Sequence, residues 1–245
     1  MIVLMKCLDE ENSVNRCISD FHDEPFCEKI IVIDGGSTDY TVQELLRFKK
    51  VSVYVHPWLD WYHDMEVCQS NIALSYVPNG ARCVIIDFDE RFSPDLKGVL
   101  NEINEQDPIE GDLISIARET NEVLRYPNSP FAMLGEDGKN PIISHRIGQF
   151  PDYQPRLITK TISMKWVNSP HHQLIGFTSQ KIIEDKFFII HYEKDDYRKR
   201  IQIERKWLRA QARRKELGLT ADVFECQPKT DICGYAEPDG WIREK

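Results

Sequence analysis

The chain has 245 residues, a length that suits one large α/β domain and argues against two full domains. With 41% hydrophobic and 29% charged residues, it has the composition of a globular protein and not of a disordered or fibrous one. The net charge of -9 argues against a general affinity for nucleic acid or anionic lipid.

The N-terminal apolar run, residues 1–5, is followed at once by Lys6 and by the acidic residues Asp9, Glu10 and Glu11. It is too short for a signal peptide or a membrane span, so we expect a first strand there. The chain has 7 cysteines, which are scattered and include no CxxC pair, so the sequence indicates neither a disulfide framework nor a zinc site. The cysteine pattern favours a cytoplasmic location.

Short apolar runs rich in Val and Ile alternate with amphipathic segments along the first third of the chain. The runs are residues 1–5, 30–33, 51–55 and 83–86, and the amphipathic segments are residues 13–21, 38–48 and 65–76. Nearly unbroken apolar strands are typical of parallel sheets that are covered on both faces. The βαβαβαβ order therefore predicts a Rossmann-like, doubly wound and mostly parallel sheet flanked by helices.

The pattern changes after Asp87. We expect a helix at residues 94–103, a strand at 113–117, an irregular stretch at 120–155 that is rich in Pro and Gly, strands at 156–159, 162–166 and 187–191, and a basic helix at 195–217. The last residues show no usable periodicity. The sequence thus predicts one domain at residues 1–217 and a C-terminal tail at residues 218–245.

Clustered carboxylates follow the fourth apolar run, in the segment Cys83-Val84-Ile85-Ile86-Asp87-Phe88-Asp89-Glu90. In open α/β sheets, ligands bind beyond the carboxyl ends of the strands. Strand alternation would put Asp87 and Asp89 on one side with Phe88 turned away, and two such carboxylates suit a Mg²⁺ or Mn²⁺ ion that holds a diphosphate. The alternative is a solvated turn or a cap for the next helix.

The second run also ends in an acid, Asp34, which Gly35, Gly36, Ser37 and Thr38 follow. Ser37 or Thr38 suits the N-cap of the next helix, and Asp34 would point into the crevice, where it would bind a base or a ribose. A β-turn with an N-cap accounts for the glycines and hydroxyls but leaves Asp34 unexplained.

Three segments in order carry a resemblance to a known family. Residues 6–12 (KCLDEEN), 31–41 (IVIDGGSTDYT) and 85–94 (IIDFDERFSP) resemble the signatures of family-2 glycosyltransferases in order and spacing. The resemblance implies a fold of the type called GT-A, a nucleoside-diphosphate sugar as donor, with a UDP-sugar expected, and a divalent metal, Mn²⁺ or Mg²⁺. It covers about the first 95 residues.

The resemblance also implies roles for single residues. Glu10 and Asp34 would contact the nucleoside, Asp87 the ribose or the metal, and Asp89 the metal. Gln69 and Asn71 fall where the family often has polar donor-binding residues. Asp9 stands where Asn is commoner in the family, which leaves the role of that turn open.

The second half of the chain is similar to the lipopolysaccharide-core-like branch of the family, through Tyr153-Gln154-Pro155-Arg156-Leu157 and His171-His172-Gln173-Leu174. Gln173 stands where that branch usually has Glu, and a Gln cannot act as a base. Asp152, His171 and His172 are therefore our candidates for the catalytic base, and both histidines also suit contacts with the acceptor or the diphosphate.

Two residues near the predicted basic helix complete the site. His191 resembles the C-terminal histidine that completes the metal site in many GT-A enzymes, although a structural role for a lone histidine stays open. Arg198, in the first turn of the helix, would neutralise the leaving diphosphate. The rest of the helix is either a solvated amphipathic face or a docking surface for an anionic acceptor.

The expected activity is metal-dependent transfer of a sugar to the hydroxyl of a glycan or similar acceptor, with inversion implied by the resemblance. A nucleotidyltransferase is disfavoured because the segment after the first strand is acidic and not a Gly-rich basic phosphate loop. Two alternatives stay open. One is a non-catalytic nucleotide-sugar-binding module, and the other is a DNA-base (hydroxymethyl-pyrimidine) glycosyltransferase that binds nucleic acid through the basic helix.

Overall fold

The computed structural model of the protein describes residues 1–58, 65–109, 111–123, 143–167 and 173–192. The helices are α1 (Glu11–Ile18), α2 (Thr41–Leu45), α3 (Met65–Ser75) and α4 (Pro94–Glu105). The strands are β1 (Ile2–Cys7), β2 (Lys29–Asp34), β3 (Val51–Val55), β4 (Arg82–Ile85), β5 (Glu90–Phe92), β6 (Asp112–Val123), β7 (Ile143–Thr159), β8 (Lys165–Val167), β9 (Gln173–Ile175), β10 (Ser179–Ile182) and β11 (Phe188–Tyr192).

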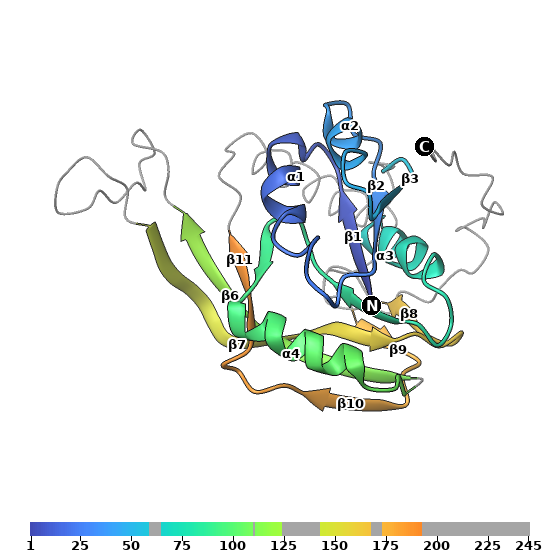
Figure 1. The fold of residues 1–245 in the computed structure, drawn as a ribbon, viewed down its shortest axis with the longest axis vertical. Coiled ribbons are helices and arrows are strands. Elements are labelled where there is room, and N and C mark those ends of the chain that lie inside the picture. Colours follow the sequence, from blue (N-terminus) through green and yellow to red (C-terminus); the bar gives the residue numbers. More distant parts are fainter. Residues whose placement is uncertain (59–64, 110, 124–142, 168–172, 193–245) are drawn as a thin grey trace, which may run out of the picture.

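Most of the described strands form one mixed sheet in the order β3-β2-β1-β4-β7-β6-β11-β5, with β10 paired to β6 (Figure 1). The first four in this order run parallel, as the βαβαβαβ pattern predicted. Strand β7 then runs antiparallel to both β4 and β6, whereas β11 runs parallel to β6. The α/β class with a mostly parallel first half is therefore confirmed.

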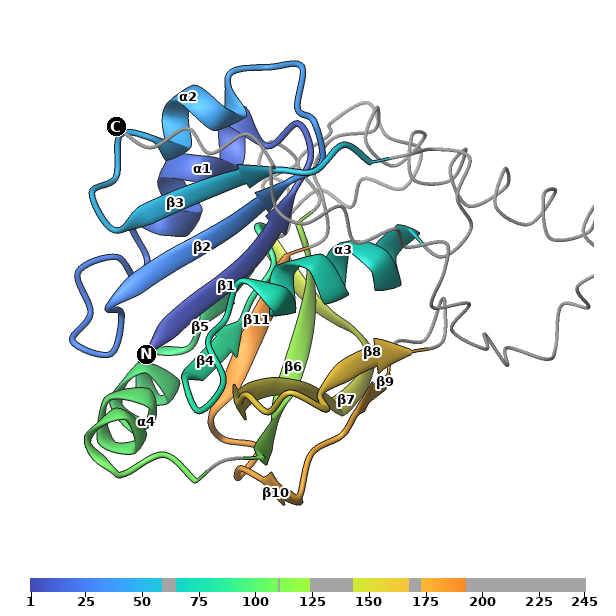
Figure 2. The same cartoon turned by 90° about the vertical axis from the view of Figure 1, so that its right-hand side faces the viewer.

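Each face of the parallel part is covered by its own apolar layer. On one face Val3 and Val32 pack with Ile18 of α1 and Leu96 of α4, and on the other face Leu4 packs with residues of α3. Successive side chains of a strand point to opposite faces, so an unbroken apolar run is what a strand covered on both faces requires. Figure 2 shows α3 on the face of β1–β3 opposite to α1 and α2.

Helix α4 begins where the sequence predicted it. The hydroxyl of Ser93 caps the helix by accepting from the backbone N–H of Leu96, and Pro94 occupies the first turn, where its missing N–H costs nothing. Leu96 and Leu100 are buried against the sheet. The helix therefore holds the segment that links β5 to β6 firmly against the core.

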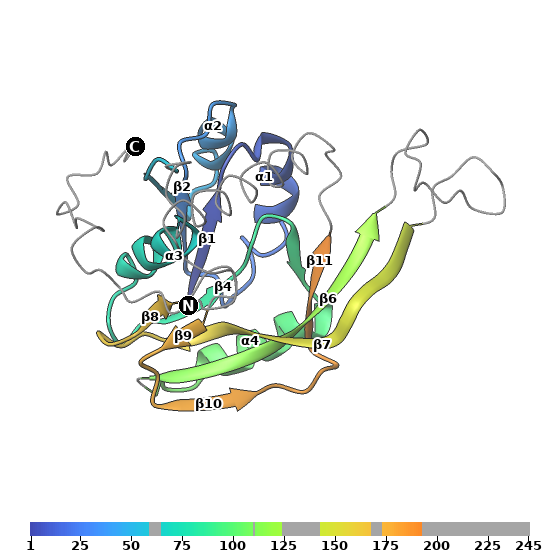
Figure 3. The same cartoon turned by 180° about the vertical axis from the view of Figure 1, so that it is seen from behind.

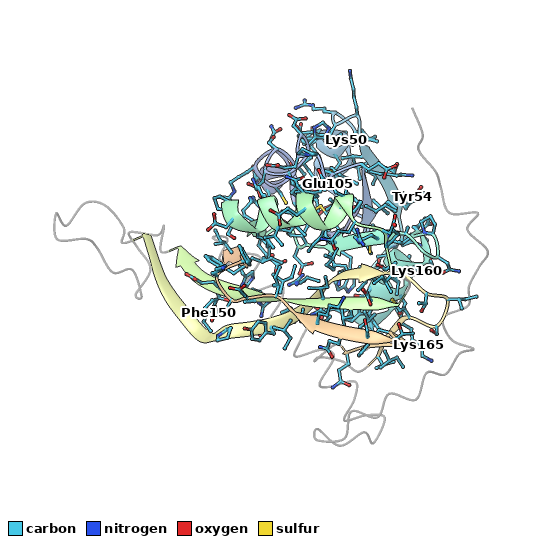
Figure 4. All side chains as sticks on the ribbon, turned by 60° about the horizontal axis from the view of Figure 1, so that its bottom comes forward. Lys50, Tyr54, Glu105, Phe150, Lys160 and Lys165 are labelled. Carbon is cyan, nitrogen blue, oxygen red and sulfur yellow. The ribbon has the colours of Figure 1, made fainter. Side chains whose placement is uncertain are left out.

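The prediction of an irregular stretch at residues 120–155 is wrong for residues 120–123 and 143–155, which the structure describes. Strand β6 runs to Val123 and β7 begins at Ile143, so the two form a long antiparallel ribbon that extends away from β1–β3 (Figure 1). Prolines are tolerated in β7 because the ladder has irregularities at which one strand carries extra residues. Phe150, labelled in Figure 4, packs edge-to-face against Phe188 of β11, with ring centroids 6.1 Å apart.

Short elements were missed by periodicity. Strands β5, β9 and β10 were not predicted, and β8 begins at Lys165, later than expected. Strand β10 lies along an edge of the large sheet and is paired only with β6 in the part of the chain that the structure describes (Figure 3). The predicted basic helix at residues 195–217 and the tail lie outside the described residues, and no described helix is long and apolar enough to span a bilayer.

Candidate functional site

Asp34 ends β2 and fixes the turn that follows it. Its side chain is 1% exposed, and one carboxylate oxygen accepts from the backbone N–H groups of Gly36 and Ser37, both at 2.9 Å. The other oxygen accepts from the Ser37 hydroxyl and lies 3.5 Å from the Cys7 sulfur. The turn pattern had left the presence of Asp34 unexplained, and these hydrogen bonds show that its carboxylate fixes the turn. The contact of Asp34 with a nucleoside stays a prediction.

The expected cap of α2 is wrong. Helix α2 begins at Thr41, and neither Ser37 nor Thr38 is at its first turn. The Ser37 hydroxyl instead donates to Asp34, and the carboxylate of Asp39 accepts from the Thr41 N–H at 2.9 Å. A carboxylate near the first turn also suits the positive end of the helix dipole.

The β1–α1 turn is joined to the β2–α2 turn by further hydrogen bonds. Asp9 has a left-handed backbone, φ 54°, and its carboxylate accepts from the Thr38 N–H at 2.7 Å. The Glu10 N–H donates to the Thr41 hydroxyl at 2.6 Å, and the Glu10 side chain is buried. Asp9, the departure from the family pattern, therefore locks the two turns together. The nucleoside contact of Glu10 stays a prediction.

Gln69 and Asn71 of α3 both bond to backbone groups. Gln69 donates to the carbonyl oxygen of His56 at 2.8 Å. Asn71 accepts from the N–H of Trp166 at 2.8 Å and donates to its carbonyl oxygen at 3.0 Å, which ties α3 to β8. These contacts hold the helix in place, and the donor-binding role of both residues stays a prediction.

Asp87 and Asp89 lie in the turn between β4 and β5 and not in a strand, because β4 ends at Ile85. The turn is closed by the Glu90 N–H, which donates to the Asp87 carbonyl oxygen at 3.0 Å. Phe88 is buried in the core, as expected. The side chain of Asp87 is 43% exposed and that of Asp89 is 19% exposed, so the turn presents both carboxylates near the surface.

Glu90 is the buried centre of a charge cluster. The cluster consists of the acids Asp87, Asp89, Glu90 and Asp152 and of the guanidinium groups of Arg118 and Arg156. Its side chain is 0% exposed, and its Oε1 lies 2.5 Å from Nη2 of Arg156 and 3.9 Å from Nη1 of Arg118. Its Oε2 accepts from the backbone N–H of Asp87 at 3.0 Å. Burial raises the pKa of the Glu90 carboxyl, and the charge of Arg156 opposes that rise.

Arg156 reaches this cluster because of an irregularity in β7. Leu157 pairs with Ile114 and Pro155 pairs with Ser115, so Arg156 is an extra residue that has no partner in the β6–β7 ladder. Such bulges redirect a side chain. The guanidinium also lies 3.6 Å from Asp87 Oδ2. Burial lowers the pKa of Arg156, but the attraction of Glu90 and then of Asp87 outweighs burial, and the pKa lies above its ordinary value.

A second ion pair extends the cluster along the ribbon. Arg118 of β6 donates to Asp152 Oδ2 from Nε at 3.1 Å and from Nη2 at 2.7 Å. Gln154 donates to the other oxygen of Asp152 at 2.7 Å. Acids and guanidinium groups therefore alternate from Asp152 through Arg118, Glu90 and Arg156 to Asp87.

His191 of β11 also lies next to the charge cluster. The strand register sets it beside Thr120 of β6 and Glu90 of β5. Its Nε2 lies 3.7 Å from Oδ2 of Asp89, and its Nδ1 lies 3.3 Å from the Thr120 hydroxyl. The structure thus brings together Asp89 and His191, two of the predicted metal ligands, with Asp87 in the same turn.

These donors fit a divalent cation that shares its coordination with a ligand. Among the described residues, no group of three or more His, Cys, Asp or Glu side chains forms a metal-binding cluster by itself. Mg²⁺ in particular is usually held by one or two carboxylates together with substrate phosphates. The charge cluster holds four carboxylates and two guanidinium groups, so the formal charges of its acids and arginines leave an excess of two negative charges.

The sequence predicted some residues of this site and missed others. Glu90, Arg118, Thr120 and Arg156 were not predicted as site residues. The signals were present in part, because Glu90 belongs to the Asp-x-Asp-Glu segment and Arg156 to the Pro-Arg-Leu segment. Three predicted site residues, His171, His172 and Arg198, lie outside the described residues.

No family model and no curated protein matches this chain. Among solved structures, S. aureus TarS (residues 1–349) in complex with UDP matches with a TM-score of 0.49 and 12% identity, covering 91% of this chain and 66% of that chain. Mannosyltransferase PcManGT from Pyrobaculum calidifontis, in complex with GDP-Man and Mn²⁺, matches with a TM-score of 0.38 and 17% identity over 48% of this chain and 35% of that one.

A third structure, that of S. aureus TarS, matches with a TM-score of 0.37 and 16% identity, covering 55% of this chain. The present chain spans between 24% and 66% of the length of these solved proteins. At these identities and TM-scores, the likeness concerns the α/β architecture alone.

Proposed function

We propose that this protein transfers a glycosyl group from a nucleoside-diphosphate sugar to a hydroxyl acceptor, with a divalent cation bound beside Asp89. One observation carries the proposal. The carboxylate of Asp89 and the imidazole of His191, which come from separate parts of the chain, lie 3.7 Å apart next to the exposed carboxylate of Asp87. Oxygen and nitrogen donors at the carboxyl edge of a parallel sheet are suited to a cation that carries a diphosphate.

The charge of the cluster supports a diphosphate complex. Asp89 and His191 would hold the cation, and Asp87 would face either the cation or the ribose. When bound, Mn²⁺ or Mg²⁺ supplies positive charge next to the oxygens of the leaving diphosphate. The excess of two negative charges in the charge cluster would otherwise repel that diphosphate, so a cation between them removes the repulsion.

The Thr120 hydroxyl orients His191 for this role. Its oxygen lies 3.3 Å from Nδ1 of the imidazole. In the tautomer whose Nδ1–H donates to Thr120, the lone pair of Nε2 points toward the side of Asp89. Hydroxyl and carbonyl groups that fix a ligand histidine in this way are a common second layer of metal sites.

Asp152 is one candidate for the base that takes the proton of the acceptor hydroxyl. Both of its oxygens already accept hydrogen bonds, from Arg118 and Gln154. Oδ1 accepts one hydrogen bond, from Gln154, and keeps a second lone pair that can receive a proton from an acceptor hydroxyl. His171 and His172 stay open as alternative bases, and Arg198 stays our prediction for a diphosphate contact.

The finer features of the proposal rest on the sequence resemblance. They are a UDP-sugar as donor and inversion at the anomeric carbon. The catalytic domain at residues 1–217 and the cytoplasmic location are predictions from the periodicity and the cysteine pattern. A glycan is the acceptor that the resemblance favours, and a nucleic-acid acceptor would require the basic segment at residues 195–217.

The test is thermal unfolding of the purified protein with each nucleoside diphosphate and its sugars, with Mn²⁺ or with EDTA. A ligand at a hundred times its Kd stabilises a protein by about 2.7 kcal/mol, which raises the Tm by roughly 5–10 °C at this size. We expect such a rise with one nucleotide class and only with the metal. No rise with any nucleotide would contradict the proposal. Binding without transfer to any acceptor would identify a binding module.

A further inference from the structure

Glu90 cannot touch a substrate, because its side chain is 0% exposed. It nevertheless contacts three groups of the charge cluster. Its Oε1 faces Arg156 at 2.5 Å and Arg118 at 3.9 Å, and its Oε2 accepts from the backbone N–H of Asp87 at 3.0 Å. Any effect of Glu90 on ligand binding must therefore pass through these neighbours.

Arg156 lies between two acids and is held by one of them. Its Nη2 is 2.5 Å from Glu90, whereas its Nη1 is 3.6 Å from Asp87. A charged hydrogen bond requires the shorter distance, so Glu90 is the main partner of Arg156, and Asp87 forms a weaker ion pair with it. Arg156 cannot retreat from the site, since it is buried and β4 and β6 hold β7 on both sides.

We infer that Glu90 is a positioning residue whose charge holds the Arg156 guanidinium and so keeps the carboxylate of Asp87 available to the bound cation. This inference rests on the proposed function. If Glu90 loses its charge, the nearest remaining acid for Arg156 is Asp87, and a guanidinium bonded to Asp87 competes directly with a divalent cation.

The test compares Mn²⁺ binding by Glu90→Gln, Arg156→Gln and the double variant with that of the wild type. Free Mn²⁺ is measured by electron paramagnetic resonance with and without each nucleoside diphosphate, against a blank that lacks the protein, and no turnover is required. We expect Glu90→Gln to bind Mn²⁺ about tenfold more weakly, since a charged hydrogen bond must then break before the cation binds. The double variant should return to within about threefold of the wild type, because no guanidinium is left to compete.

The recovery of Mn²⁺ binding in the double variant distinguishes a Glu90 that positions Arg156 from a Glu90 that only stabilises the β4–β5 turn. If Glu90 only supported the β4–β5 turn, removing its partner as well would leave Mn²⁺ binding weak. Asp112→Asn is the matched control, since Asp112 pairs with Ser179 and Lys181 and, within the described part of the chain, forms no hydrogen bond or ion pair with the charge cluster. Its Mn²⁺ affinity should equal that of the wild type.

Circular dichroism melts establish which variants fold. If Glu90→Gln does not fold, Arg156→Gln and the double variant carry the test, and the Mn²⁺ affinity of both should be within about threefold of the wild type or tighter. Binding more than about threefold weaker than that of the wild type, in either folded variant, would overturn the inference. Wild-type affinity in folded Glu90→Gln would overturn it too and leave the proposed function standing. A wild type that binds Mn²⁺ neither alone nor with any nucleoside diphosphate would remove both.

Discussion

Two groups of carboxylates lie at the carboxyl edge of the parallel strands, and they differ in their partners. The loop-locking carboxylates accept hydrogen bonds from backbone N–H groups and hydroxyls, and they are Asp9, Asp34 and Asp39. The paired carboxylates face guanidinium or imidazole groups, and they are Asp87, Asp89, Glu90 and Asp152.

This difference separates structure from ligand binding. Backbone N–H groups stay where the fold puts them, so a carboxylate that accepts from several of them is fixed and gives rigidity to its turn. Side-chain cations on long stems can exchange partners, so a carboxylate paired with them is able to bind an incoming cation or release a charge. We therefore expect mutations in the first group to change stability and those in the second group to change cation binding.

The largest expected effect is that of Asp89→Ala on cation binding. Removing this carboxylate should weaken Mn²⁺ binding by about a hundredfold or more, since ligand charge contributes several kcal/mol. The melting temperature without metal should stay close to that of the wild type, because the side chain is near the surface. Mn²⁺ titration and thermal melts measure the two quantities. Asp95→Ala, an exposed acid of α4, is the control, and wild-type Mn²⁺ affinity in Asp89→Ala would break the comparison.

Asp34→Ala should have the opposite profile. It deprives the Gly36 and Ser37 N–H groups of their acceptor in a buried turn, so the free energy of unfolding should fall by about 2–4 kcal/mol. Urea unfolding measures this loss, and Mn²⁺ affinity of the folded fraction should not change. We also expect weaker donor binding. Asp34→Asn should be intermediate because its amide keeps one acceptor oxygen. An unfolding curve of Asp34→Ala that matches the wild type would show that the hydrogen bonds to Asp34 do not stabilise the protein.

Thr120→Val sharpens the comparison with a smaller change. Valine keeps the shape of threonine but removes the hydroxyl that lies 3.3 Å from Nδ1 of His191. Mn²⁺ affinity should fall by about tenfold, as is usual when a ligand histidine loses the group that orients it. Thr120→Ser, which keeps the hydroxyl, should retain the affinity. Equal Mn²⁺ titrations for Thr120→Val and the wild type would remove Thr120 from the site.

The smallest expected effect concerns His56, at the end of β3, whose Nε2 lies 2.7 Å from the Tyr76 hydroxyl. Burial lowers the pKa of His56 below 6.5, so the unfolded chain takes up a proton at a higher pH than the folded protein does. Its contribution to stability is therefore present above pH 6.5 and is lost as the pH falls below it. Urea midpoints at pH 7 and pH 5 should differ less in His56→Gln than in the wild type, and an equal difference in both would contradict the assignment.

The sequence predicted well what neighbouring residues determine. The order of β1 to β4, the helix at Pro94 and the position of Asp89 beyond a buried strand all follow from local patterns. The turn role of Asp34 was missed, although a local pattern could have indicated it, because an Asp whose N–H partners lie two and three residues later is a common turn motif.

Contacts between distant elements were not predictable from these patterns. Arg156 meets Glu90 only because β7 pairs with β6 in one register, and the proline and glycine residues before Arg156 hid all of this strand except its predicted end at residues 156–159. The pairing of β11 beside β6, which brings His191 to Asp89, depends on the packing of Phe188 and Ile189 against residues far away in the chain. Periodicity carries no information on such pairings.

The extra residue in β7 makes the site sensitive to strand length. Deleting Gln154 or Pro155 would allow Arg156 to take a regular place in the ladder opposite β6, and a shift by one residue turns a side chain to the other face of a sheet. The apolar pairs on either side would be able to re-form, so such a shortened protein would keep much of its core. It would lose the guanidinium from the charge cluster. For this strand, insertions and deletions are therefore more damaging to function than most substitutions, and a transplanted site would need the same spacing between Asp152 and Leu157.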